Sequence, residues 1–226
     1  MPDKTAQDPV KRRARPGKAP LSRELILTTA QRLLDRDGLP GVSLRKIAAE
    51  LDTGPASIYV YVSNMQELHS LLLDRALSEV DLSGDGTGDA RERLQAILHS
   101  YLRTLLDRPG LAKLAGAMPH GPNALRLTEA LLDALLDSGV APPSAAWGVD
   151  LLLLHVAALA AELSYRREGG RELNEVADVY ARAPAEDFPR IRQVSTHLFS
   201  GDGPTRFRWQ LDALIQGIGQ VCRPLN

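Results

Sequence analysis

Thiol chemistry is almost absent from this sequence, which has one cysteine, Cys222, among its 226 residues. A single cysteine excludes an internal disulfide and a thiolate metal site within the chain, and it is typical of a reducing compartment. We therefore expect a cytoplasmic protein. The five histidines form no H-x-x-x-H or H-E-x-x-H pair, so the sequence predicts no metal site.

Aromatic residues are scarce at 4%, although apolar residues make up 44% of the chain. This composition predicts a helical protein with a core of leucine and alanine. Long uncharged apolar runs are also missing, because the longest candidate, 149–163, contains Asp150, His155 and Glu162. A membrane-spanning helix needs about 20 mostly apolar residues. The N-terminus is polar rather than hydrophobic, so we expect neither a signal peptide nor a membrane partner.

Motifs of catalysis and cofactor binding are missing too. The sequence contains no G-x-S-x-G, no P-loop and no G-x-G-x-x-G. These absences indicate that the chain is not an enzyme and predict no cofactor.

Charge is unevenly distributed along the chain, although the net charge is only −1. Residues 1–50 hold 11 Lys and Arg against 6 Asp and Glu, whereas 51–226 hold 16 against 22. The first 20 residues contain four prolines and a cluster of basic side chains, and we predict a disordered basic tail there. Such a tail either aids solubility or lies along DNA phosphates.

Residues 43–65, SLRKIAAELDTGPASIYVYVSNM, have the pattern of two short helices joined by a tight turn. Ser43 is a good N-cap, and apolar residues follow it at helical spacing. Residues 52–54 interrupt that pattern. Pro55 suits the first turn of a second helix, where its missing N–H costs nothing. Two helices crossing at such a turn form a helix-turn-helix, whose second helix enters the DNA major groove.

The second helix is predicted to bury Ile58 and Val62, which are four residues apart. Its other face is small, hydroxylated and nearly uncharged, and it carries Ala56, Ser57, Tyr59 and Tyr61. A helix this short is unstable alone, so neighbouring elements must hold it and leave that face exposed.

Together with a helix over 22–37 and another from Ser63, which a Ser-x-x-Gln capping box is predicted to open, this unit resembles the DNA-binding domain of the TetR family of transcriptional regulators. Two residues depart from the family pattern. Asp52 stands where the family usually has glycine, but aspartate tolerates a left-handed turn. Met65 stands where the family often has a phosphate-binding lysine. The matching residues are Gly38, Gly41, Val42, Ser43, Leu44, Arg45, Lys46, Ile47, Ala48, Leu51, Ala56, Ser57, Ile58, Tyr59, Tyr61, Val62, Ser63 and Asn64.

The resemblance implies double-stranded DNA as a partner and assigns roles to the exposed side chains. We expect Arg45 to read a guanine edge, and Lys46 and Tyr59 to bind phosphates. The alternative is that Tyr59 is partly buried and that both basic residues form a solvated face. The predicted DNA-binding residues are Ser43, Arg45, Lys46, Thr53, Pro55, Ala56, Ser57, Tyr59 and Tyr61.

The chain is predicted to be all-α, because no β-alternation appears anywhere. We expect a DNA-binding domain at 21–80, a glycine- and aspartate-rich linker at 81–89, and a helical ligand-binding and dimerisation domain at 90–226. The helices predicted in this last region are 90–107, 123–137, 144–167, 186–199 and 205–221.

The C-terminal region resembles the tetracycline-repressor type of regulatory domain through 121–125, 187–189 and 206–218. This resemblance implies a homodimeric, ligand-responsive repressor on a palindromic operator, with 144–167 and 205–221 forming the dimer interface. The candidate residues for the effector pocket are Tyr101, Met118, Trp147 and His155, although packing is the favoured explanation for Trp147 and His155.

The same resemblance places the metal-binding histidine of tetracycline repressors near Ala115, which cannot bind a metal. We therefore expect a mainly apolar effector that needs no metal. One alternative is a DNA-bound organiser whose C-terminal domain binds a protein, distinguished by a packed centre instead of an apolar cavity. Another is a helical enzyme, which the missing catalytic pairs argue against.

Overall fold

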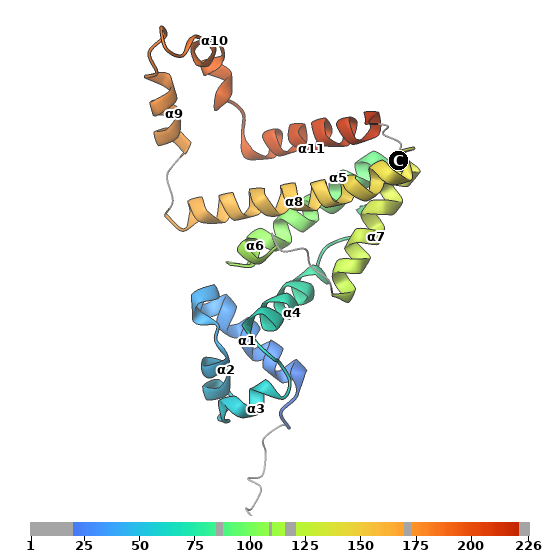
Figure 1. Ribbon diagram of the computed structural model, residues 1–226, viewed down its shortest axis with the longest axis vertical. Helices are drawn as coiled ribbons and strands as arrows, with labels where there is room; N and C mark the ends of the chain where they lie inside the picture. The colour runs from blue at the N-terminus through green and yellow to red at the C-terminus, as the bar shows by residue number, and fades with distance from the viewer. Residues whose placement is uncertain (1–19, 85–87, 109, 116–120, 170–172, 222–226) are drawn as a thin grey trace, which may run out of the picture.

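The computed structural model describes residues 20–84, 88–108, 110–115, 121–169 and 173–221. Every regular element among these residues is a helix, which confirms the predicted all-α fold. Figure 1 shows a lower lobe made of the first helices, an upper lobe of long helices, and α4 running between them.

The lower lobe consists of five short elements: α1 (Arg23–Asp37), the 3-10 helix η1 (Leu39–Gly41), α2 (Leu44–Glu50), α3 (Pro55–Tyr59) and α4 (Met65–Leu77). Ser22, predicted as the first residue of a helix, is its N-cap, and its hydroxyl accepts the Leu25 N–H at 3.2 Å. Gly38 ends α1 with a φ of +68°, a conformation that favours glycine.

The predicted Ser63 capping box is wrong by one residue. The N-cap of α4 is Asn64, whose Oδ1 accepts the Glu67 N–H at 2.8 Å. Glu67 in turn accepts the Ser63 N–H through Oε2 at 2.7 Å. Asn64 therefore takes the place of Ser63 as N-cap, and Glu67 takes the place of Gln66 as the side chain that reaches back to a backbone N–H, because a carboxylate accepts an N–H more strongly than an amide does.

The upper lobe contains the remaining helices, whose starts depend mainly on proline and aspartate. Asp89 caps α5 through the Glu92 N–H at 2.9 Å. Proline lies in the first turn of α7, α8, α10 and α11, where its ring fits the helix and no N–H is lost. The bounds are α5 Ala90–Leu106, α6 Leu111–Leu114, α7 Pro122–Asp137, α8 Pro142–Arg167, α9 Leu173–Ala181, α10 Pro189–Leu198 and α11 Gly203–Gln220.

These bounds correct several predicted ones. The helix predicted at 186–199 begins only at Pro189, and α11 begins at Gly203 because Asp202, its N-cap, accepts the Thr205 N–H at 2.7 Å. Between α8 and α10, where no helix bounds were predicted, the structure contains α9.

Two apolar clusters form the cores of the two lobes. The lower cluster unites α1, α2, α3 and one face of α4, and it also includes Leu111 of α6. The upper cluster unites α5, α7, α8 and α11 with Leu73 and Leu77 of α4. Gly110 lies so close to η1 that a Cβ there would be 2.6 Å from the Leu39 Cβ. The helix α4 therefore belongs to both cores, and the α5–α6 segment packs against the lower lobe.

By length and composition α8 would be able to cross a membrane, with a mean hydropathy of 1.6 over its most apolar window. Its place in the fold explains this composition, because α8 packs against α5, α6, α7 and α11. One apolar face of α8 packs in the upper core, and a second one lines a groove between α8 and α11.

The pair α9 and α10 stands apart from the long helices as an arm (Figure 1). Tyr180 of α9 meets Phe199 edge-on, with ring centroids 5.2 Å apart. No residue of α10 is buried, while Val179, Phe188 and Val194 are all exposed apolar side chains.

Candidate nucleic-acid interface

The turn between α2 and α3 is closed by backbone hydrogen bonds around Asp52. The Asp52 N–H donates to the Ala49 carbonyl at 3.0 Å, and the Thr53 N–H donates to the Ala48 carbonyl at 2.9 Å. This pair of bonds is a Schellman motif, which places one residue in the left-handed region. Asp52 takes that position with a φ of +45°, as the sequence predicted for the residue in place of glycine.

The helix α2 is anchored by its N-cap and by an apolar face. The Ser43 hydroxyl accepts the Lys46 N–H at 3.2 Å. Leu44, Ile47 and Ala48 face the core and are at most 6% exposed. The chain between these buried positions is exposed, which leaves Arg45 and Lys46 on the surface.

Arg45 and Lys46 differ in their surroundings. Lys46 lines a shallow hollow beside α1 together with Arg36, Asp37 and Glu50. The Arg36 hydrogen bond, helped by the Lys46 charge, lowers the pKa of Asp37. Among the described residues Arg45 has no ion pair, so its guanidinium is free to meet an outside acceptor. Arginine matches a guanine edge with two parallel hydrogen bonds, whereas a lysine ammonium meets a phosphate as a point charge.

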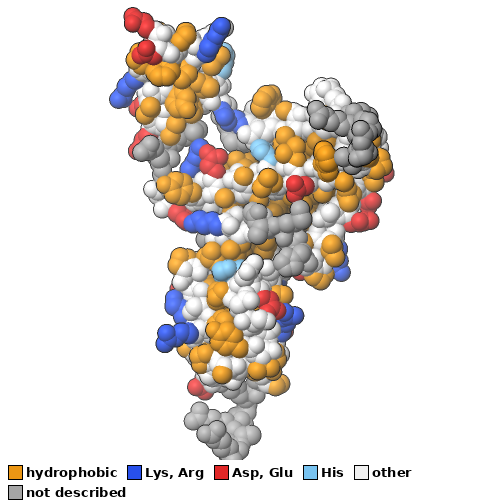
Figure 2. Space-filling view, in the orientation of Figure 1, with side chains coloured by type: hydrophobic (Ala, Val, Ile, Leu, Met, Phe, Trp, Pro, Cys, Tyr) orange, Lys and Arg blue, Asp and Glu red, His pale blue; other side chains and the backbone are white. Residues whose placement is uncertain are grey.

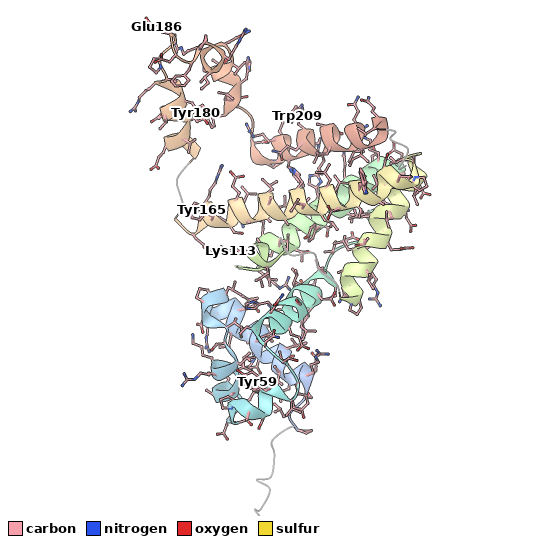
Figure 3. All side chains as sticks on the ribbon, viewed as in Figure 1. Tyr59, Lys113, Tyr165, Tyr180, Glu186 and Trp209 are labelled. Carbon is pink, nitrogen blue, oxygen red and sulfur yellow. The ribbon has the colours of Figure 1, made fainter. Side chains whose placement is uncertain are left out.

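The helix α3 is held from below by two buried side chains, Ile58 and Val62, as the spacing predicted; both are 0% exposed. Val62 lies beyond the helix, which ends at Tyr59. Tyr59, which lies in the lower lobe in Figure 3, is 55% exposed, and Val60 is 79% exposed. Sequence reasoning missed Val60, although its position midway between the two buried residues indicates the solvent side.

All nine predicted DNA-binding residues lie on the α2–α3 unit or directly beside it. Arg45, Lys46, Pro55, Ala56 and Tyr59 are exposed, and the others are half-buried: Ser43, Thr53, Ser57 and Tyr61. A Cβ on Gly54 would meet no atom within 4 Å, so the surface in front of the turn is open. The unit thus presents hydroxyl, phenol, guanidinium and small apolar groups, which suit base edges and phosphates.

The four residues predicted for an effector pocket lie in different surroundings. Tyr101 of α5 is 0% exposed in the upper core, where burial raises the pKa of its phenol. Trp147 of α8 is 64% exposed. His155 is half-buried, and its Nε2 is a buried atom with no partner among the described residues. Met118 lies outside the described residues.

Trp147 instead lines an apolar groove between α8 and α11, with a volume of about 260 Å³. Gly148 and Leu151 continue the α8 wall, and Leu214 and Ile218 form the α11 wall. Figure 2 shows hydrophobic side chains over these two helices. Farther along α8, Leu154 is 53% exposed. Trp147, Leu151 and Leu154 therefore form an apolar stripe at helical spacing on one of the two helices that the sequence analysis assigned to a dimer interface.

Both lobes match models of known protein families. Residues 26–70 match the family model of bacterial regulatory proteins, tetR family, and residues 83–222 match that of the tetracyclin repressor-like C-terminal domain. An HTH-type transcriptional regulator of Saccharopolyspora erythraea is 31% identical over 173 residues, 76% of this chain and 73% of its own length. The HTH-type transcriptional repressor DrrR1 of Streptomyces coeruleorubidus is 30% identical over 73% of this chain and 62% of its own length.

Among solved structures, apo ActR from Streptomyces coelicolor superimposes with a TM-score of 0.79 and 32% identity, covering 89% of this chain and 96% of ActR. ActR in complex with actinorhodin also gives 0.79, with 33% identity, 88% of this chain and 97% of that one. These relatives are regulators, which confirms the prediction that the chain is not an enzyme.

Proposed function

Because this chain belongs to the TetR family of transcriptional regulators, we propose that it is a ligand-responsive repressor that binds a palindromic operator as a homodimer. It works in the cytoplasm on double-stranded DNA, without a cofactor. The lower lobe, 21–80, serves as the DNA-binding domain, 81–89 as the linker, and 90–226 as the regulatory domain. The two apolar clusters support this division.

The observation that carries the DNA-binding role is the exposed face of the α2–α3 unit. Ile58 and Val62 fix the second helix from below, so Ala56, Ser57 and Tyr59 face outward without acidic neighbours on the same helix. A five-residue helix offers too few contacts to select a site alone. Two copies related by a two-fold axis read two half-sites, which supplies the missing selectivity.

The apolar stripe supports the homodimer. Trp147, Leu151 and Leu154 expose three large apolar side chains on one face of α8, next to the α11 wall of the groove. Apolar patches of this kind mark association surfaces. Packing the stripe against its copy joins α8 and α11 of both chains into a four-helix bundle, and burying each such side chain contributes about 1.5–3 kcal/mol.

The composition of the upper core suits an apolar effector, although the core is packed around Tyr101, which is 0% exposed, so α5, α7 and α8 must separate to admit a ligand. The helices α5, α7 and α8 face one another with leucine, isoleucine and alanine, and Tyr101 adds one phenol. A ligand held there would bury apolar surface and use few hydrogen bonds, with Tyr101 and His155 as donors or acceptors. ActR, of similar fold, has been crystallised with actinorhodin. A metal chelate is not expected, because Ala115 offers no ligand atom.

The test uses the DNA site that the purified protein selects from random sequence. Actinorhodin and a panel of apolar compounds are added to the complex, and release is followed by fluorescence anisotropy with and without Mg²⁺. We expect an apolar compound to release the DNA equally well in both conditions. Release that needs Mg²⁺ would overturn the metal-independent effector. Release by no small molecule, together with capture of a protein by the exposed arm, would favour the protein-binding organiser.

A further inference from the structure

The N-terminus of α7 is capped by a side chain from another helix. The N-cap residue of α7 is Gly121, which has no side chain, and Pro122 follows it and has no N–H. The next two N–H groups, of Asn123 and Ala124, both donate to Asp74 Oδ1 at 3.0 Å. A carboxylate at this position satisfies the free donors and complements the positive end of the helix.

The Asn123 side chain adds two more hydrogen bonds to Asp74, and this set of bonds between Asp74 and the first turn of α7 is the α4–α7 joint. The Asn123 Nδ2 donates to the Asp74 carbonyl oxygen at 3.0 Å and to Asp74 Oδ2 at 3.1 Å. The side chain and the backbone of Asp74 are therefore both held by the first turn of α7. Four hydrogen bonds with different directions fix an orientation as well as a distance.

Asp74 lies where the two cores meet, so these bonds connect the two lobes. It lies on α4, between Leu72 in the lower core and Leu77 in the upper core. The other contacts across this boundary are apolar packing, such as that of Leu111 in the lower core, and the ion pair between Arg108 and Glu79. Between α4 and α7 themselves, the hydrogen bonds of Asp74 are the directional contacts among the described residues.

We propose that Asp74 is the positioning residue that makes α4 and α7 move as one unit, so that a rearrangement of the regulatory domain reaches the recognition helix. This inference rests on the proposed function, since it concerns regulation of the same DNA site. Coupling between two sites is reciprocal, so operator binding at the lower lobe must also shift the conformational equilibrium of α7.

A substitution at Gly121 offers a second way to break the joint while residue 74 remains aspartate. A Cβ at position 121 would lie 2.1 Å from Asp74 Cγ and 2.2 Å from Oδ1. The φ of Gly121 is −89°, which alanine adopts without strain. Gly121→Ala therefore acts on the joint by displacing the Asp74 carboxylate. In an Asp74→Ala background the obstacle is absent, and the same substitution is expected to have no further effect.

The experiment measures amide hydrogen exchange in the peptide that covers α7, with and without the selected operator DNA. In the wild type, operator binding is expected to slow exchange at the first turn of α7 by about fivefold or more. In Asp74→Ala and Gly121→Ala this response should disappear while the DNA still binds and still protects the lower lobe. Asp74→Asn keeps the shape and one acceptor but loses the charge, so it should keep part of the response.

Asp137→Ala is the matched control. It removes a carboxylate at the other end of α7, where Asp137 pairs with Arg93 at 2.9 Å inside the upper lobe, and it should leave the response intact. A wild-type α7 that ignores bound operator would overturn the inference, as would an unchanged response in Asp74→Ala and Gly121→Ala. Failure to select any DNA site would instead refute the proposed function, and this inference would fall with it.

Discussion

Gly148 of α8 faces Ile218 of α11 at a distance that leaves no room for a side chain. A Cβ at position 148 would lie 2.7 Å from Ile218 Cγ2, a branched group that cannot turn away freely. This glycine lets the two helices approach closely at the groove, and the approach brings the apolar walls of α8 and α11 together.

Gly148→Ala should therefore destabilise the protein, because overpacking costs about 1–3 kcal/mol and exceeds the gain in helix propensity. The control is Gly219→Ala in α11, where a Cβ meets nothing within 4 Å. That change should instead add about 0.5–1 kcal/mol. Denaturant unfolding measures whether each substitution lowers or raises the free energy of unfolding. A stabilised Gly148→Ala would contradict the close packing of α8 against α11.

The dimer interface is tested by placing charge on the exposed stripe. Leu151→Glu combined with Leu154→Glu should give monomers in sedimentation velocity, because carboxylates cannot be buried unpaired between two copies. Both residues are more than 40% exposed, so the fold of each chain should survive. Ile218 is a poorer choice, since it is buried within one chain. A double variant that still sediments as a dimer would place the interface elsewhere.

Base reading is tested at Arg45. Arg45→Ala should weaken binding to the operator by about 1–3 kcal/mol and relax the preference at one base pair in each half-site. Lys46→Ala, the neighbouring change of equal charge, should weaken operator and random DNA alike, and Tyr59→Phe should do the same. Competition binding with single-base operator variants distinguishes these outcomes. Equal losses on operator and random DNA for Arg45→Ala would show that it contacts only phosphates.

The left-handed turn residue is tested by a β-branched substitution. Asp52→Val forces a β-branched side chain to a φ of +45° and should cost about 1–2 kcal/mol of stability. Asp52→Asn keeps a side chain that tolerates this conformation and should cost clearly less stability than Asp52→Val. Thermal unfolding of the pair measures the conformational cost, and equal melting temperatures would contradict it.

Acid sensitivity is expected from the cap of α4. The hydrogen bond from the Ser63 N–H, followed by the Arg23 charge, lowers the pKa of Glu67 below its ordinary value of 4.5. A lowered folded-state pKa stabilises the protein above about pH 4.5, and this contribution is lost as pH falls through the folded value. Glu67→Gln should therefore lower the melting temperature near neutral pH and make little difference in acid. A constant difference between the two proteins at all pH values would contradict this assignment.

Much of the fold follows from local rules that operate within one element. Ile58 and Val62 share a face because of helical spacing, and Asp52 takes the turn because short polar side chains tolerate it. The Ser63 cap failed because two adjacent polar residues competed, and Glu67 at the third position favoured Asn64. The joint at Asp74 could not be predicted from the sequence, because it connects residues that are 49 apart in the chain. Trp147 and Tyr101 were grouped as pocket residues, yet their exposure depends on how α8 packs, which periodicity does not specify.

The most direct test of the central claim is the symmetry of the DNA that the protein selects. Purified wild-type protein is incubated with random duplexes, the bound fraction is sequenced through several rounds, and the mass of the complex on the enriched site is measured. We predict two inverted half-sites with centres about 10 base pairs, or a multiple of that, apart, bound by an even number of chains. A pool with no enriched sequence, or a single half-site bound by one chain, would contradict the account.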